Sequence, residues 1–117
     1  MLLKSFKYAI WGISVCLKER NFKIHLIAAT LVIIAGTYFK VTSFEWLIII
    51  LNIGLVLSLE MINTAIERWV DYVSPEKNKI AGQIKDISAG ATLVGAIIAA
   101  VCGSIIFYKY FIDLINT

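Results

Sequence analysis

The stretch IIILNIGLVLSLEMINTAIERWVD, residues 48–71, sets the class of fold, because it is apolar enough for a membrane and yet carries acids. Four of its polar residues are Glu60, Asn63, Glu67 and Asp71. On a helix that advances about 100° per residue they fall within one arc of about 80°, so they form a polar stripe. A carboxylate inside a bilayer is costly unless it is paired, protonated or hydrated. The stripe is therefore a candidate functional site.

The composition around this stretch is that of an integral membrane protein with a single domain, residues 1–117. Hydrophobic residues make up 60% of the chain, and its mean hydropathy is +0.85. A net charge of +3 is too small to indicate nucleic-acid binding. Cys16 and Cys102 have no paired spacing, so we expect two free thiols.

Apolar segments predict an all-α membrane protein with an N-terminal amphipathic surface helix and three transmembrane helices. The surface helix is expected over residues 1–20, where apolar positions recur at helical spacing opposite lysines. Packing of this helix against a bundle is an equal alternative. The spans are expected at residues 24–39, 44–73 and 87–110, joined by a tight turn at 40–43 and a polar loop at 74–86.

Basic residues predict the orientation of the spans. Lysines and arginines precede the first and third spans, and the positive-inside rule places these residues in the cytoplasm. Glu67 and Asp71 then lie near the cytoplasmic end of the second span, and Glu60 lies one to two turns deeper. We therefore expect a multi-pass protein of the bacterial cytoplasmic (inner) membrane, with its site on the cytoplasmic side.

Small residues recur every four positions in the third predicted span and indicate close helix packing. They are Ala91, Gly95, Ala99 and Gly103. Three helices of this size make a thin bundle, so we expect a homo-oligomer. The pattern does not fix the number of subunits.

The polar residues on the predicted cytoplasmic face suit a magnesium nucleotide. They offer hard oxygen ligands for a metal and positive charge for phosphates. The chain contains no Walker loop and no motif of the soluble protein kinases. From composition and spacing alone, the sequence indicates only an acidic, membrane-embedded site that opens to the cytoplasm.

Two blocks of sequence carry a more specific resemblance. They are EMINTAIERWVD, residues 60–71, and AGQIKDISAGA, residues 81–91. Together they resemble the prokaryotic diacylglycerol kinase family, which also includes undecaprenol kinases, and the resemblance extends from about Lys4 to Tyr110. It implies a homotrimer with shared active sites, which transfers the γ-phosphoryl group of MgATP to a membrane lipid alcohol.

The resemblance also implies roles for individual residues. Glu60 matches the proposed general base, and Asn63 matches its polar neighbour. Glu19 and Glu67 match glutamates that bind Mg²⁺. The positions that match nucleotide-binding residues are Tyr8, Glu19, Glu67, Glu76, Asn78, Lys85 and Asp86. Asp71 belongs to the motif and is expected to have only a supporting role.

The segment ERNFKIH, residues 19–25, resembles the undecaprenol kinase branch of the family more than the diacylglycerol kinase branch. This segment favours undecaprenol over diacylglycerol as the acceptor. We expect His25 itself to be an interfacial histidine without a catalytic role.

Two other classes of function also fit buried acids. One is a small oligomeric proton or cation channel that uses Glu60 and Glu67 as a relay. This channel does not explain the Lys85-Asp86 pair. The other is a membrane scaffold whose acids only bond helices together.

Overall fold

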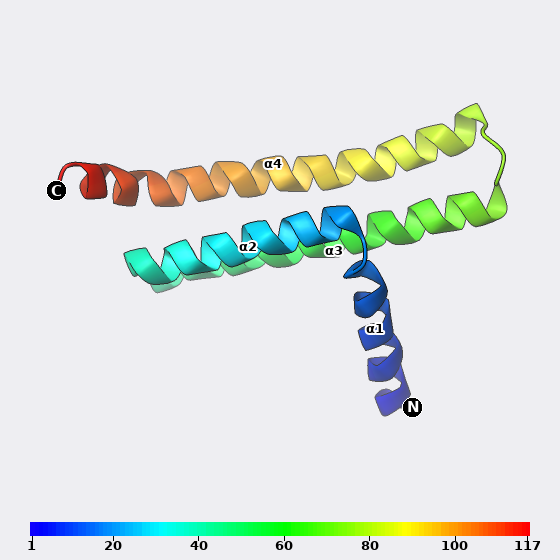
Figure 1. The fold of residues 1–117 in the computed structure, drawn as a ribbon, viewed down its shortest axis with the longest axis horizontal. Coiled ribbons are helices and arrows are strands. Elements are labelled where there is room, and N and C mark those ends of the chain that lie inside the picture. Colours follow the sequence, from blue (N-terminus) through cyan, green and yellow to red (C-terminus); the bar gives the residue numbers. More distant parts are fainter.

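Four helices and no strand make up the computed structural model, which describes all of residues 1–117. The helices are α1 (Leu2–Cys16), α2 (Arg20–Phe39), α3 (Ser43–Val73) and α4 (Lys79–Ile115). In Figure 1, α2, α3 and α4 run alongside one another, and α1 points away from them. α3 packs against both α2 and α4, so it is the central element of the protomer.

Three of these helices are long and apolar enough to cross a membrane. They are α2, α3 and α4, and their most apolar windows have mean hydropathies of 1.7, 2.0 and 2.2. This agrees with the expected number of spans. α1 is exposed along its length except for Cys16. Its placement on a membrane surface stays a prediction.

The turn between α2 and α3 is built from local backbone chemistry. Lys40 ends α2 in the left-handed conformation, with φ of 55°. Thr42 then begins α3 as the first residue of a capping box, in which its side chain accepts from the Glu45 amide while the Glu45 carboxylate accepts from the Thr42 amide. These contacts satisfy amides that the first helical turn leaves free. The tight turn expected at residues 40–43 is confirmed.

The loop between α3 and α4 is shorter than the predicted polar loop at residues 74–86. α4 begins at Lys79, where the Asn78 side chain accepts a hydrogen bond from the Ala81 amide. Residues 79–86 are therefore helical, and their charges belong to an exposed helical turn. Polar composition alone did not distinguish such a turn from a loop. The other boundaries also shift: α1 ends at Cys16, α2 begins at Arg20, and α4 continues to Ile115.

The buried core lies at the end of the bundle that contains the α2–α3 turn. Val41, Ile49, Ile106 and Phe107 form it. Next to it, the buried carboxylate of Glu45 accepts a hydrogen bond from the Tyr110 hydroxyl and lies 3.0 Å from Lys109 Nζ. The last part of α4 is thus attached to the first turn of α3.

Close packing between α3 and α4 occurs at Gly95, one of the two glycines among the four predicted small residues. A Cβ atom added at Gly95 would lie 2.7 Å from Leu59 Cδ1, so the absence of a side chain there admits the leucine. A Cβ atom at Gly103 would meet nothing within 4 Å in the protomer.

Most apolar side chains of the protomer remain exposed. Only 16 of the 117 residues are buried, and exposed large hydrophobic residues occur on all four helices. Such extensive apolar surface suits contact with lipid tails or with other copies of the chain.

Candidate active site

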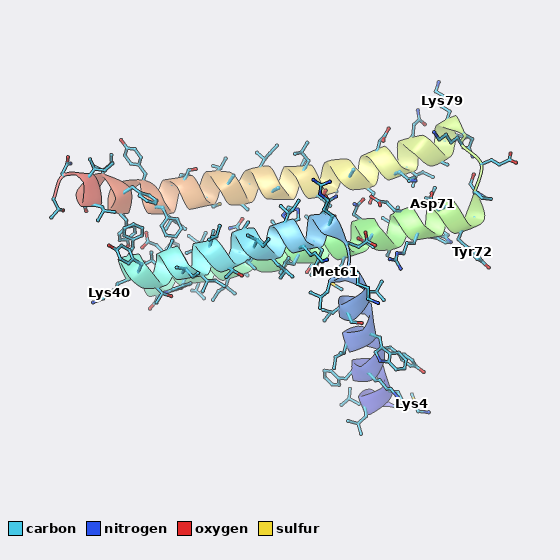
Figure 2. All side chains as sticks on the ribbon, in the orientation of Figure 1. Lys4, Lys40, Met61, Asp71, Tyr72 and Lys79 are labelled. Carbon is cyan, nitrogen blue, oxygen red and sulfur yellow. The ribbon has the colours of Figure 1, made fainter.

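The candidate site lies where α3 and α4 extend past the beginning of α2. Figure 1 shows this extension, and Figure 2 labels Met61 near the beginning of α2 and Asp71 farther along α3. At a rise of about 1.5 Å per residue, Glu60 lies about 26 Å from the first residue of α3 and Asp71 about 42 Å. A hydrocarbon core is about 30 Å thick. When α3 begins at the opposite surface, Glu60 therefore lies inside the hydrocarbon, about 4 Å from its edge, and Asp71 lies beyond it.

The polar stripe passes from buried to exposed along α3. Glu60 and Asn63 are 3% and 4% exposed, Glu67 is half-buried, and Asp71 is exposed. The predicted stripe therefore faces the inside of the protomer at its deep end and solvent at its outer end. One face of α3 therefore carries a buried carboxylate at its deep end and water-accessible carboxylates at its outer end.

The deep end of the stripe has a histidine as its neighbour. His25 Nε2, on α2, lies 3.5 Å from Glu60 Oε2, within ion-pair distance. The imidazole is about a quarter exposed, whereas the Glu60 side chain is buried. His25, which we expected to be an interfacial histidine without a catalytic role, thus contacts the proposed general base.

One turn farther along α3, Asn63 and Glu67 form a pair. Asn63 Nδ2 donates a hydrogen bond of 2.9 Å to Glu67 Oε1. The other polar atom of the amide, Asn63 Oδ1, is buried and has no hydrogen-bond partner. Buried polar atoms are normally paired, so an unpaired oxygen beside a carboxylate is a candidate ligand atom.

Glu19 reaches the same end of the bundle from the residue that precedes α2. Its Oε1 accepts a hydrogen bond of 2.8 Å from Arg68 Nη2, on α3. Arg68 was not among the predicted site residues, although it directly follows Glu67 in the first sequence block. Cys16 is buried nearby, and burial raises the pKa of its thiol, while the positive charge of Arg68 partly opposes this shift.

A polar hollow of about 330 Å³ lies between the exposed ends of α3 and α4. Lys85 Nζ donates a hydrogen bond of 2.8 Å to Asp71 Oδ1 at this hollow, so the two predicted residues form a pair. Its lining also contains three other predicted nucleotide-binding residues, which are Glu76, Asn78 and Asp86.

Some predicted residues are not brought together within the protomer. Tyr8 is exposed on α1, where its ring packs edge-on against Trp11 with centroids 5.6 Å apart. Glu19 and Glu67, the expected metal ligands, contact Arg68 and Asn63, respectively. No cluster of three or more histidine, cysteine, aspartate or glutamate side chains suited to a metal is present in the chain.

An apolar groove of about 260 Å³ runs between α2, α3 and α4 on the other side of His25. Most of its lining residues are hydrophobic, and those from α4 include Ala96, Ala99 and Gly103. Two of the four predicted small residues therefore line this groove. His25 belongs to the lining, so one imidazole contacts both Glu60 and the groove.

Comparison with known proteins places this chain in a family of membrane lipid kinases. The sequence model of the prokaryotic diacylglycerol kinase family matches residues 7–107, and the chain belongs to that family. The resemblance inferred from the two sequence blocks is confirmed. The chain is thus a multi-pass membrane protein and an ATP-dependent lipid kinase.

Three relatives illustrate the range of the family. The undecaprenol kinase of Bacillus subtilis (strain 168) is 43% identical over 89% of this chain and 85% of its own length. The diacylglycerol kinase of Synechocystis sp. is 38% identical over 87% of this chain and 59% of its own length. The diacylglycerol kinase of Escherichia coli (strain K12) is 25% identical over 94% of this chain and 91% of its own length. These relatives support an enzyme and give no support to a channel.

Proposed function

We propose that the protein transfers the γ-phosphoryl group of MgATP to the hydroxyl group of a membrane lipid. The observation that carries this proposal is the position of Glu60. This buried acid lies on the same helix face as Asn63 and Glu67, between an apolar groove and the exposed end of the bundle. A lipid alcohol and a nucleotide could approach such an acid from opposite sides.

The acceptor would bind on the apolar side. The groove between α2, α3 and α4 offers hydrophobic contacts to a lipid tail, and it ends at His25, beside Glu60. A tail in this groove would place its hydroxyl group near the Glu60 carboxylate. The carboxylate could then accept the hydroxyl proton as a general base.

The nucleotide would bind on the polar side. The hollow between α3 and α4 contains Lys85, whose positive charge could neutralise phosphate oxygens. Glu76, Asn78 and Asp86 also line the hollow and could contact the nucleotide there. Asp71 would have a supporting role, because it pairs with Lys85 and holds the ammonium group in position.

The donor atoms near Glu67 fit Mg²⁺, which prefers oxygen ligands. Glu67 offers a carboxylate, and the neighbouring Asn63 Oδ1 is buried without a partner. Glu19 would supply a further carboxylate from the beginning of α2. When bound with ATP, the ion would neutralise charge on the phosphate oxygens. In the protomer, Arg68 holds Glu19 in place.

The chemical step is a direct transfer. The hydroxyl oxygen of the lipid forms a bond to the γ-phosphorus, the bond from that phosphorus to the bridging oxygen of ADP breaks, and Glu60 takes the hydroxyl proton. Positioning and charge stabilisation account for most of the catalysis of such transfers. The residues in this chain that provide them are Glu60, Asn63, Glu67 and Lys85.

The proposal includes an orientation and an assembly. Basic residues precede α2 and surround the α3–α4 loop, which favours a cytoplasmic position for this end in a bacterial inner membrane. The extensive exposed apolar surface is compatible with contacts between copies of the chain, and the family resemblance implies a homotrimer with shared sites. In such a trimer, Tyr8 could reach the nucleotide of a neighbouring subunit, which it does not do within one protomer.

The acceptor we favour is undecaprenol, with diacylglycerol as the second candidate. The segment at residues 19–25 and the name of the Bacillus subtilis relative support undecaprenol. The names of the more distant relatives support diacylglycerol. Both lipids present an alcohol on an apolar tail, so one site chemistry serves either of them.

The test replaces Glu67 with Gln in purified protein and measures phosphorylation of both lipids with labelled ATP. We expect E67Q to lose at least about tenfold in kcat/KM on either lipid, because an amide is a weaker metal ligand than a carboxylate. Asp113→Asn is the matched control, since Asp113 is an exposed acid at the opposite end of α4. Undiminished turnover of both lipids by E67Q would remove Glu67 from the metal site.

A further inference from the structure

The contact between His25 and Glu60 supports a further inference. This inference rests on the function proposed above and adds a residue to it. We propose that His25 is a positioning residue for Glu60: its Nε2 atom holds the carboxylate in the orientation that receives the hydroxyl proton of the lipid. The supporting geometry is the distance of 3.5 Å between His25 Nε2 and Glu60 Oε2, together with the position of His25 at the end of the apolar groove.

Glu60 needs such a partner, because its side chain is buried. In the protomer its carboxylate has no ion pair other than the one with His25 and accepts no side-chain hydrogen bond. A buried carboxylate without a donor is strongly disfavoured. Nε2 can donate a hydrogen bond to Glu60 once the two groups move closer, whether the imidazole is neutral or charged, provided that Nε2 carries the proton.

The packing of α2 on α3 orients His25 toward Glu60. Phe22 lies one turn earlier on the same face of α2 and is 3% exposed. Its burial fixes the rotation of the first turns of α2, so His25 faces α3 and not the lipid. The adjoining Glu19–Arg68 pair joins the beginning of α2 to α3 and limits sliding between these helices.

The position of His25 explains why the contact matters for catalysis. The imidazole lies between the groove and the base, so a hydroxyl group that arrives through the groove passes it before it reaches Glu60. The present distance is long for a hydrogen bond, and catalytic contacts often tighten only once substrate is bound. Misplacement of a reacting group by about 1 Å can cost about 100-fold in rate.

Two polar variants separate positioning from packing. Gln places its amide nitrogen about as far from the backbone as Nε2, whereas Asn reaches only about as far as Nδ1. We therefore expect H25Q to keep kcat within about threefold of the unmodified protein and H25N to lose about 10- to 100-fold. The KM for ATP should change by less than about threefold in both variants, since His25 lies outside the polar hollow.

A matched control tests for a general effect of altering α2. Thr30 is exposed on the same helix and lies outside the groove and the hollow, and its Oγ1 atom donates to the Leu26 carbonyl. T30A should keep the kcat of the unmodified protein. Addition of imidazole to H25A offers a second measurement, in which recovery of at least part of kcat supports a role for the ring nitrogen itself.

The results that would overturn the inference are distinct from those that would overturn the proposed function. Equal kcat in H25Q and H25N, whether high or low, would show that a donor at the Nε2 position is not required. Failure of the unmodified protein to phosphorylate either lipid, or full activity in E60Q, would instead contradict the lipid-kinase mechanism built on Glu60.

Discussion

At the scale of single residues, the acids of α3 differ because their surroundings differ. Glu60 is buried beside His25, Glu67 is half-buried and bonded to Asn63, and Asp71 is exposed and paired with Lys85. Each acid therefore has one polar neighbour, and the acids themselves become more accessible to water toward the end of the helix. The same residue type can thus face a lipid hydroxyl at one end of the stripe and a nucleotide at the other.

Cys16 provides a test of the electrostatics close to this stripe. Burial raises the pKa of its thiol above the ordinary value of 9.0, and the charges of Glu19 and Glu60 act in the same direction. A raised pKa means a smaller thiolate fraction at any pH below it, and the thiolate is the reactive form. In a Cys102→Ser background, we expect the pH midpoint for alkylation of Cys16 by iodoacetamide to exceed that of a peptide containing residues 10–20.

The alkylation experiment also has an internal control. Arg68 lowers the thiol pKa, so R68Q should move the midpoint still higher. A midpoint at or below that of the peptide would contradict the burial of Cys16.

At the scale of secondary structure, the beginning of α4 shapes the proposed nucleotide site. Asn78 caps this helix through a hydrogen bond of 2.8 Å from the Ala81 amide, and its Nδ2 atom donates to Ser74 Oγ. The cap sets where the helix begins and hence the direction in which Lys85 and Asp86 project. Asn78 was predicted from the resemblance as a nucleotide-binding residue, and the structure shows a structural use for the same side chain.

Replacement of Asn78 separates these two uses. N78A should lower the free energy of unfolding by about 0.5–2 kcal/mol, because the Ala81 amide loses its partner. N78D keeps an accepting oxygen and should retain most of that stability. The measurement is a denaturant titration in detergent micelles, with Lys77→Ala as a control in the same loop. Equal stability of N78A and the unmodified protein would show that the cap contributes nothing.

At the scale of the whole molecule, the two ends of the bundle have different roles. The end that contains the α2–α3 turn holds the buried core and the contacts of Glu45 with Tyr110 and Lys109. The other end holds the polar hollow and the acids of the stripe. The contacts of Glu45 join α4 to α3 at the first end, and the proposed substrate sites lie at the second.

Removal of the Glu45 side chain should weaken the packing of α4 on α3 at the end of the bundle that contains the α2–α3 turn. It should not change catalysis at the end that contains the polar hollow. In E45A, Tyr110 and Lys109 lose their shared partner, and the Thr42 capping box is broken. We expect faster hydrogen exchange at residues 107–115 and at the beginning of α3, with kcat unchanged. Asp113→Ala is the control, because that side chain is exposed on the same part of α4. Unaltered hydrogen exchange in E45A would contradict the prediction that Glu45 holds the last part of α4 against α3.

Much of the fold and part of the site could be predicted from local sequence. The polar stripe is a property of one helix, so its spacing alone aligned Glu60, Asn63, Glu67 and Asp71. The beginning of α4 was misplaced, because exposed helical turns and loops have similar polar compositions. Arg68 was missed as a partner of Glu19, since the two residues are 49 positions apart and meet only when α2 packs on α3.

The sequence by itself determined the class of protein, the three apolar helices and the face on which the acids lie. Each of these depends on composition or on helical period, which are local properties. The tertiary structure alone decided that His25 contacts Glu60, that Lys85 pairs with Asp71, and that an apolar groove ends at the imidazole. These features depend on the rotation and offset of packed helices, which arise from contacts among residues distant in sequence.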